Sequence, residues 1–140
     1  MPTASHTARI TSADDLVPLL DKLSAQLAWT AKARYQIELA LDELIGNTLT
    51  HGKPPNYGGI QPAVFIDVCF EQVDVIVKIT LTDNGIAFDP TSAVAPDVTS
   101  GAEDRKIGGL GLYFAAKMMD TISYQFSGGR NHVVLCKQLS

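Results

Sequence analysis

The sequence is poor in the residues that would indicate a metal centre or a disulfide framework. Its 140 residues include only two cysteines, Cys69 and Cys136, with neither a CxxC pair nor a Cys/His cluster, which argues against a zinc site. Free cysteine packs as a small hydrophobic side chain, and both residues fall in strand-like segments. We therefore expect two buried, reduced thiols rather than a redox pair.

Long apolar runs and an excess of positive charge are also missing. No stretch approaches the roughly 18 apolar residues of a membrane-spanning helix, and the N-terminal region lacks the basic start and apolar run of a signal peptide. Lysine and arginine total 11 against 15 acidic residues, which gives a net charge of −4 without a basic block for nucleic acid. These features predict a cytoplasmic protein that contacts neither membranes nor nucleic acid directly.

The sequence does contain enough apolar material for one core. Hydrophobic residues make up 46% of the chain, which excludes a wholly disordered protein. A domain typically takes roughly 100–200 residues, and one of this size buries about two-thirds of its unfolded surface. We predict that residues 1–140 form a single domain.

Two helices are predicted in the first half of the chain. The first covers 12–28, where leucines recur at helical spacing and the leading serine is a suitable N-cap. The second runs from about 30 to 51 and ends at Gly52, because the prolines that follow cannot continue it. Glycine and proline dominate 52–62, which we interpret as a loop.

Strands are predicted on both sides of these helices. Residues 6–11 predict a short edge strand, and apolar residues alternate with polar ones along 64–70 and 75–81. A short polar connection at 72–74 joins the last two as an antiparallel hairpin.

The C-terminal third adds a helix and a second hairpin. The helix covers 109–119, and the hairpin pairs 122–126 with 132–139. Residues 91–107 have no period, and a stretch of that length is usually functional or mobile. The order β-α-α-β-β-α-β-β favours an α+β, two-layer sandwich, with a mostly antiparallel mixed sheet and helices on one face.

Glu43 and Asn47 give the second helix a polar face. They lie four residues apart, so their side chains meet. One interpretation is an ordinary surface pair. The other is functional, because amide and carboxylate oxygens suit Mg²⁺, and Glu43 can take a proton or position a nucleophile.

Asp83 stands at the end of a strand, in the segment Asp-Asn-Gly-Ile-Ala-Phe-Asp-Pro. One interpretation is a simple turn. A carboxylate held there also accepts hydrogen bonds, and so can recognise an exocyclic amino group such as that of adenine. Gly85 would then let a ligand ring approach the backbone, and Phe88 is expected to be buried.

The third helix opens with the sequence Gly108-Gly109-Leu110-Gly111-Leu112. Glycines weaken a helix start, so their presence needs a reason. Either they allow close packing of helix on sheet, or bare N–H groups at this N-terminus receive a phosphate. The pattern is neither a Walker A loop nor a Rossmann fingerprint.

Three segments taken together resemble the N, G1 and G2 boxes of the GHKL ATPase superfamily. Glu43 and Asn47 match the N box, 83–90 match G1, and 109–112 match G2. Within the superfamily the chain is most similar to the anti-sigma-factor serine/threonine kinases of bacteria. The resemblance covers almost the whole chain and implies a Bergerat-type ATP-binding fold.

The resemblance implies a role for each matched residue. Asn47 would coordinate the Mg²⁺ that bridges the ATP phosphates, and Glu43 would act as general base or orient the attacking hydroxyl. Asp83 would accept a hydrogen bond from the adenine amino group, and Gly85 would leave room for the ring. The other residues expected to bind the nucleotide are Ala87, Phe88, Arg105, Lys106, Gly108, Gly109, Leu110, Gly111 and Leu112.

Further roles follow from the same resemblance. Residues 91–107 would form a lid over ATP, at whose end Arg105 and Lys106 contact either the γ-phosphate or a partner, or are simply solvated. His51 either contacts a phosphate or is a helix C-terminal histidine favoured by the dipole. The chain departs from the family at Asn131, where many members carry a Gly-Thr pair that helps to hold the adenine-binding aspartate, and no role is assigned to it.

The family substrate is a serine on a small antagonist protein of the STAS fold. The family also commonly binds a sigma factor and commonly forms homodimers. Two alternatives stay open: a nucleotide-dependent switch that binds a partner with little or no kinase activity, and a detached ATP-binding domain of a histidine kinase. The latter is less favoured, because no phosphoacceptor helix precedes the domain in this sequence.

Overall fold

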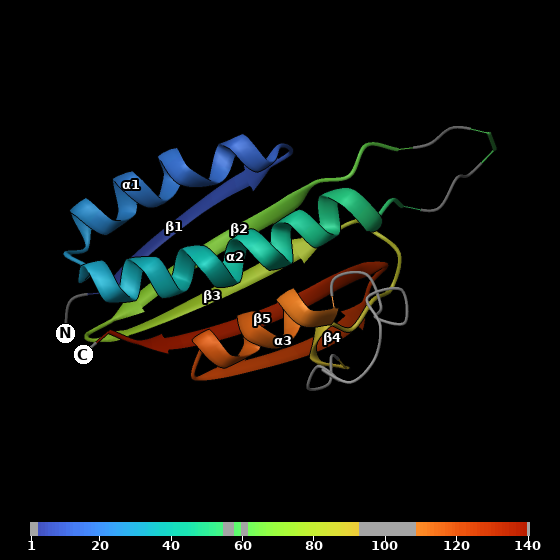
Figure 1. Ribbon diagram of the computed structural model, residues 1–140. Helices are drawn as coiled ribbons and strands as arrows, with labels where there is room; N and C mark the ends of the chain where they lie inside the picture. The colour runs from blue at the N-terminus through green and yellow to red at the C-terminus, as the bar shows by residue number, and fades with distance from the viewer. Residues whose placement is uncertain (1–2, 55–57, 60–61, 93–108, 140) are drawn as a thin grey trace.

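The computed structural model describes residues 3–54, 58–59, 62–92 and 109–139. These residues form five strands, three α-helices and two short 3-10 helices (Figure 1). In chain order the elements are β1 (Thr3–Ile10), η1 (Ala13–Asp15), α1 (Leu16–Gln26), α2 (Ala31–His51), β2 (Ile66–Val73), β3 (Ile76–Asp83), η2 (Pro90–Ser92), α3 (Gly109–Met118), β4 (Thr121–Ser127) and β5 (Arg130–Gln138). The expected order of helices and strands is confirmed.

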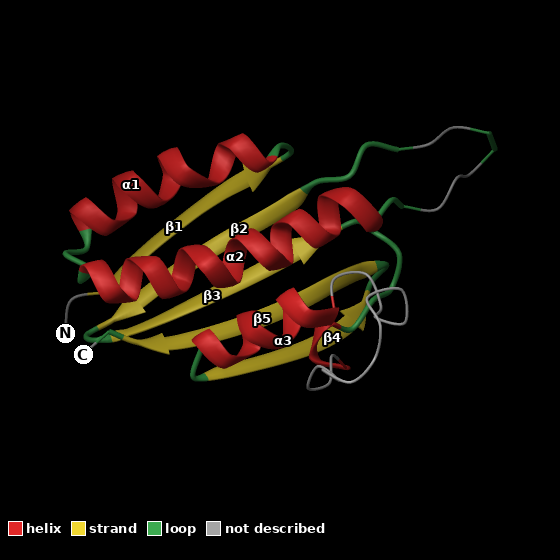
Figure 2. Ribbon diagram, in the orientation of Figure 1, coloured by secondary structure: helices red, strands yellow, loops and turns green. Residues whose placement is uncertain are grey.

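The strands form one sheet in the order β1-β2-β3-β5-β4. All four ladders between described strands are antiparallel, so this sheet has no parallel pair. Figures 1 and 2 show the three α-helices together on one face of the sheet, with α2 crossing its middle. The α+β two-layer sandwich is therefore confirmed, with a sheet more uniformly antiparallel than expected.

The first two helices have well-defined ends, and the structure confirms the expected N-cap Ser12 and the expected C-terminal Gly52. The Ser12 side chain accepts a hydrogen bond from the backbone N–H of Asp14, and the Asp15 carboxylate accepts one from the backbone N–H of Ser12, which completes a capping box. Thr30 caps α2 through Ala33 N–H at 3.1 Å, and Gly52 closes its C-terminus. The first helix is thus a 3-10 turn followed by an α-helix.

The core lies between the helices and the inner face of the sheet. Alternate residues of β2 and β3 are buried, namely Ile66, Val68, Phe70, Val77, Ile79 and Leu81. The helices cover them with leucines and isoleucines, including Leu16, Leu20, Leu23, Ile37, Leu41 and Ile45. Val75 departs from the expected pattern, because it lies in the β2–β3 turn and is exposed.

The two cysteines are free, as expected, but the prediction that they are buried is wrong. Cys69 and Cys136 are both half-buried. Each follows the alternation of its strand, next to the core residues Phe70 and Leu135, and so points to the opposite face. A two-layer fold covers only one face of its sheet, which explains their partial exposure.

No helix in the described segments is both long and apolar enough to cross a lipid bilayer.

Candidate functional site

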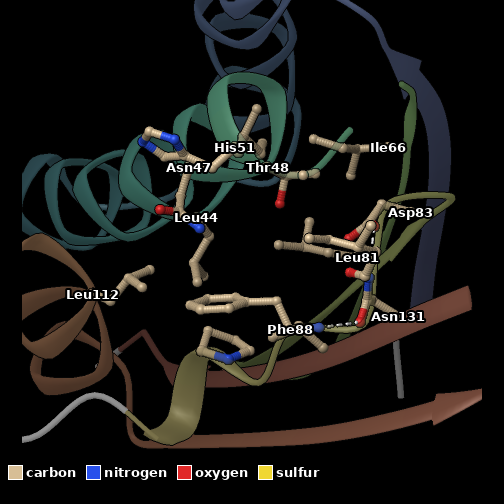
Figure 3. A pocket seen from close by; sticks show the side chains of 15 residues that line it. Leu44, Asn47, Thr48, His51, Ile66, Leu81, Asp83, Phe88, Leu112 and Asn131 are labelled. Carbon is tan, nitrogen blue, oxygen red and sulfur yellow. Dashed lines mark hydrogen bonds between the residues drawn. The ribbon is translucent and has the colours of Figure 1, made fainter. Parts of the chain in front are cut away.

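A cavity of about 240 Å³ opens where the C-terminal half of α2 meets the ends of β2, β3 and β5. Its wall is mostly apolar, with contributions from Ile66 and Leu81 of the sheet, Leu44 of α2 and Leu112 of α3. Figure 3 shows these side chains around the cavity, with Asp83 and Asn131 on the strand side and Asn47 on the helix side. The polar residues that line it are Asn47, Thr48, His51, Asp83 and Asn131.

Asp83 is the buried carboxylate of the cavity. It is the last residue of β3 and is only 6% exposed. Its Oδ1 atom accepts hydrogen bonds from the backbone N–H of Gly85 at 2.8 Å and from Asn131 Nδ2 at 2.9 Å. Within the described residues no hydrogen bond reaches the second oxygen, Oδ2. Because no buried side-chain oxygen there lacks a partner, Oδ2 is not itself buried. Oδ2 is therefore the acceptor that Asp83 offers to the cavity.

Asn131 is the residue of the candidate site that the sequence argument missed. It lies opposite Asp83 in the β3–β5 ladder and is 4% exposed. A usable signal was present: period-two alternation puts Asn131 on the same face as Val133 and Leu135, and a polar residue on a core face needs hydrogen-bond partners. Its hydrogen bond to Asp83 depends on the pairing of β3 with β5, and the sequence pattern alone does not give that pairing.

Tyr124 extends this hydrogen-bond network to the edge strand β4. Its hydroxyl donates to Asn131 Oδ1 at 2.5 Å. Burial raises the pKa of the Tyr124 phenol above its ordinary value, and the negative charges of Asp89 and Asp83 add to this effect. The phenol thus stays protonated and keeps donating.

Phe88 forms one wall of the cavity, but the prediction that it is buried is wrong. Its ring faces the open space (Figure 3) and is 46% exposed. Its backbone N–H donates to Asn131 Oδ1 at 3.1 Å, which holds the loop after β3 in place. Ala87, the preceding residue, is exposed and does not line the cavity. The ring is exposed because it borders a hollow rather than the core.

The packing of the protein itself gives Gly85 a reason to be glycine. A Cβ atom at this position would overlap the backbone carbonyl oxygen of Gly52. The turn after β3 therefore packs directly against the C-terminus of α2, and Gly85 does not itself line the cavity. The absence of a Cβ at Gly85 thus allows this backbone contact, and its expected contact with a ligand ring stays a prediction.

Asn47 and Glu43 occupy different surroundings although both lie on α2. Asn47 lines the cavity, as does His51 in the last turn of the helix. Glu43 is exposed and does not line it, and its carboxylate lies against Gly111, where an added Cβ would overlap Glu43 Oε2. The N-terminal turns of α3 thus rest beside Glu43.

The third predicted segment is partly described. Gly109 and Leu110 begin α3, and Leu112 is 3% exposed and lines the cavity. Arg105, Lys106 and Gly108 lie outside the described residues, as does nearly all of the expected lid. The structure brings Asn47, Asp83, Phe88 and Leu112 to the cavity, whereas Glu43, Gly85, Ala87 and Gly111 do not line it.

The described residues contain no cluster of three or more histidine, cysteine, aspartate or glutamate side chains that would hold a metal ion by themselves. A divalent cation at Asn47 would therefore need ligands from a bound molecule. Mg²⁺ in nucleotide sites is held in this way, by one or two protein oxygens, phosphate oxygens and water.

Residues 7–137 match the family described as the histidine kinase-like ATPase domain, and the chain belongs to that family. Among curated proteins it is similar to the serine/threonine-protein kinase BtrW of Bordetella bronchiseptica. The two are 32% identical over 133 residues, which cover 95% of this chain and 90% of the relative. The resemblance to anti-sigma-type kinases of this superfamily is confirmed.

Solved structures share the fold. The RsbU and RsbW domains of Rv1364c from Mycobacterium tuberculosis match with a TM-score of 0.59 at 15% identity, over 99% of this chain and 33% of that one. The catalytic domain of the histidine kinase ThkA matches with a TM-score of 0.55 at 11% identity, over 96% of both chains. The histidine kinase AdeS of Acinetobacter baumannii matches with a TM-score of 0.51 at 12% identity, over 100% of this chain and 70% of that one.

Proposed function

We propose that this protein is a Mg-ATP-dependent serine/threonine protein kinase that acts as an anti-sigma regulatory factor. The observation that carries the proposal is the buried Asp83 carboxylate, which offers one free oxygen to a mostly apolar cavity. A flat apolar ring with one exocyclic amino group complements such a cavity, and adenine has both features. The 32% identity to a serine/threonine-protein kinase supports the kinase activity.

The phosphates are proposed to extend from this cavity toward Asn47 and the start of α3. Asn47 supplies one amide oxygen for Mg²⁺, whose charge offsets that of the phosphates. The backbone N–H groups of Gly109 and Gly111 lie in the first turn of a helix, which is a favourable place for an anion. Residues 91–107 are proposed as the lid, with Arg105 and Lys106 near the γ-phosphate or the partner.

Glu43 is proposed as the general base. The serine Oγ attacks the γ-phosphorus, the new O–P bond forms, and the bond to the β-phosphate oxygen breaks to release ADP. The serine proton passes to the Glu43 carboxylate. Glu43 lies beside Gly111, at the start of α3 where the phosphates are proposed to bind, and this position supports the role.

The proposed substrate is a serine on a STAS-type antagonist protein in the cytoplasm. A sigma factor is the proposed second partner, and a homodimer the proposed assembly. These proposals rest on the kinship with the anti-sigma kinases, and direct binding to nucleic acid or membrane is not part of them.

The first experiment is thermal unfolding of the wild type and of Asp83→Asn, with ATP or ADP and with or without Mg²⁺. Ligand at about 100 times its dissociation constant stabilises the native state by about 2.7 kcal/mol, or roughly 10 °C in Tm. We expect this shift in the wild type and its loss in Asp83→Asn, because the amide presents a donor in place of an acceptor.

Asp67→Asn is the matched control for this experiment. Asp67 is a carboxylate on the neighbouring strand, paired with Arg9 on the open face of the sheet. Its variant should keep the full ATP shift. Equal shifts in Asp83→Asn and the wild type would overturn the adenine-binding role of Asp83, and a wild type without any shift would overturn ATP binding.

The second candidate function is a nucleotide-dependent binding switch without phosphate transfer. The position of Glu43 outside the lining of the cavity favours it. Transfer from labelled ATP to a STAS-type protein separates the two functions. Under the kinase proposal Glu43→Gln lowers transfer by roughly 10²–10⁴-fold and leaves ATP binding in place.

The neighbouring exposed carboxylate in Asp42→Asn provides the control for Glu43→Gln and should retain transfer. Transfer by Glu43→Gln at the wild-type rate would refute its role as general base. An acid-labile phosphohistidine product, in place of acid-stable phosphoserine, would favour the histidine-kinase alternative.

A further inference from the structure

Two arginine side chains lie over one aromatic ring at one end of the sheet. The Arg9 guanidinium is 3.9 Å from the centroid of the Phe65 ring, and the Arg130 guanidinium is 5.5 Å from it. Arg9 and Arg130 each precede a buried residue of their own strand, so alternation directs both to the face that the helices leave uncovered. We call Arg9, Phe65, Asp67 and Arg130 the arginine corner.

The charges of the arginine corner do not cancel. Arg9 is paired with Asp67 through two hydrogen bonds, from Nε at 2.8 Å and from Nη2 at 3.0 Å. Within the described residues Arg130 forms no ion pair, and its guanidinium donates to the backbone carbonyl of Gly129 at 3.4 Å. The pKa of Asp67 lies below its ordinary value, mainly because of the hydrogen bond from Arg9, and the nearby charge of Arg130 adds to this effect. One exposed positive charge is therefore left over.

Phe65 gives the two guanidinium groups a fixed support. Its backbone N–H donates to Asn84 Oδ1 at 2.9 Å, and its side chain is half-buried. A guanidinium that stacks on an aromatic ring keeps its N–H groups free at the edge of its plane, and its planar fork is organised before binding. Arginine and aromatic side chains are also the ones that contribute most to protein–protein binding.

We propose that the arginine corner is a docking site for a protein partner, which it binds through an acidic segment whose carboxylate pairs with Arg130. The fork of a guanidinium matches a carboxylate with two parallel hydrogen bonds. The adjoining rows of the open face carry short, uncharged side chains, among them Thr7, Thr80 and Thr82, which leave a partner room to approach.

The charge of the whole chain favours an acidic segment of a protein over a longer polyanion. The net charge is −4, so a nucleic acid or an anionic membrane would be repelled by most of the surface while meeting one unpaired arginine here. The arginine corner lies on the opposite face of the sheet from the cavity that Asp83 lines. The inference therefore does not rest on the proposed binding of ATP.

The test titrates the isotope-labelled protein, without nucleotide, with a hexaglutamate peptide that is capped at both ends. Two-dimensional NMR follows the backbone amides and the arginine Nε–H groups. We expect saturable shifts at Arg9, Phe65 and Arg130, and binding that is weaker by about tenfold or more in Arg130→Gln, because hydrogen bonds between charged groups are lost. Arg130→Lys keeps the charge without the planar fork, so it should also bind more weakly than the wild type.

Lys78→Gln is the matched control. Lys78 is another exposed cation on the open face, opposite Glu71 in the β2–β3 ladder, and its loss changes the net charge by the same amount. This variant should keep the wild-type affinity for the peptide. The NMR spectrum also reports whether each variant is folded, and Arg130→Lys provides the comparison if Arg130→Gln is not.

Three results would overturn the inference. The first is a wild type without saturable shifts at the arginine corner. The second is equal affinity in Arg130→Gln and Lys78→Gln, which would indicate a general attraction between charges. The third is tighter binding, at the same resonances, of oligothymidylate or of vesicles with equal parts of phosphatidylglycerol and phosphatidylcholine, which would indicate a phosphate site. None of these results bears on ATP binding, which the thermal unfolding of Asp83→Asn tests separately.

Discussion

Gly46 and Gly85 differ in what an added methyl group would meet. At Gly46, within α2, a Cβ would have no neighbour within 4 Å, whereas at Gly85 it would overlap the Gly52 carbonyl. We expect Gly46→Ala to raise the free energy of unfolding by about 0.4–1 kcal/mol, since alanine restricts the unfolded chain and favours the helix. We expect Gly85→Ala to lower it by about 1–3 kcal/mol, because backbone must move.

Urea denaturation of both variants measures this difference, with each serving as the other's control. Equal effects of the two substitutions would show that the contact between the turn after β3 and the end of α2 does not constrain the fold. Gly46→Ala has a second use, because a stabilised variant with weakened nucleotide binding would place part of the ligand beside that residue.

At the residue scale the sequence predicted positions better than surroundings. Asp83, Asn47 and Leu112 all line one cavity. Their places, at the end of a strand and on predicted helices, follow from local sequence patterns. The contact that explains Gly85 involves Gly52, and it depends on how α2 ends against the sheet. The role of Asn131 depends on strand register. Neither can be read from local pattern, and the functional roles of these residues stay predictions.

At the scale of elements, the N-cap of α2 offers a direct test. Thr30 accepts from Ala33 N–H at 3.1 Å, and α2 carries Asn47 at its other end. We expect Thr30→Ala to lower the free energy of unfolding by about 1 kcal/mol, since an orphan N–H loses its acceptor. Thr30→Ser keeps the capping oxygen and should lie close to the wild type in the same denaturation assay. A similar loss in both variants would contradict the capping role.

The elements themselves were largely predictable. Caps, helix periodicity and period-two strands are local signals, and the two-residue turn Gly128-Gly129, with φ of 60° and 72°, is the kind of connection that the second hairpin requires. The order of strands in the sheet was not predictable in this way, because β1 pairs with β2 across two helices and β3 pairs with β5 across both α3 and β4. Such long-range pairings leave no local trace.

At the scale of the whole molecule, the lack of local signals for long-range packing also explains why the burial of the cysteines was predicted wrongly. Strand character was predicted correctly for both, but which face of the sheet is covered depends on where three helices pack. The class of fold could be predicted from the order of helices and strands alone, and the structure confirms both the order and the class.

The hydrogen bond between Asp83 and Asn131 joins residues 48 positions apart, and it crosses the β3–β5 ladder, which links the β2–β3 hairpin to the β4–β5 hairpin. Hairpins close quickly, whereas pairing over long sequence separations is slow. We therefore expect the candidate pocket to form only when the hairpins have docked, late on the folding pathway. If the proposed ATP binding is right and the transition state lacks this pocket, ATP should slow the unfolding rate and leave the refolding rate unchanged. Stopped-flow chevron plots with and without ATP measure both rates, and faster refolding with ATP would instead mean that the pocket forms early.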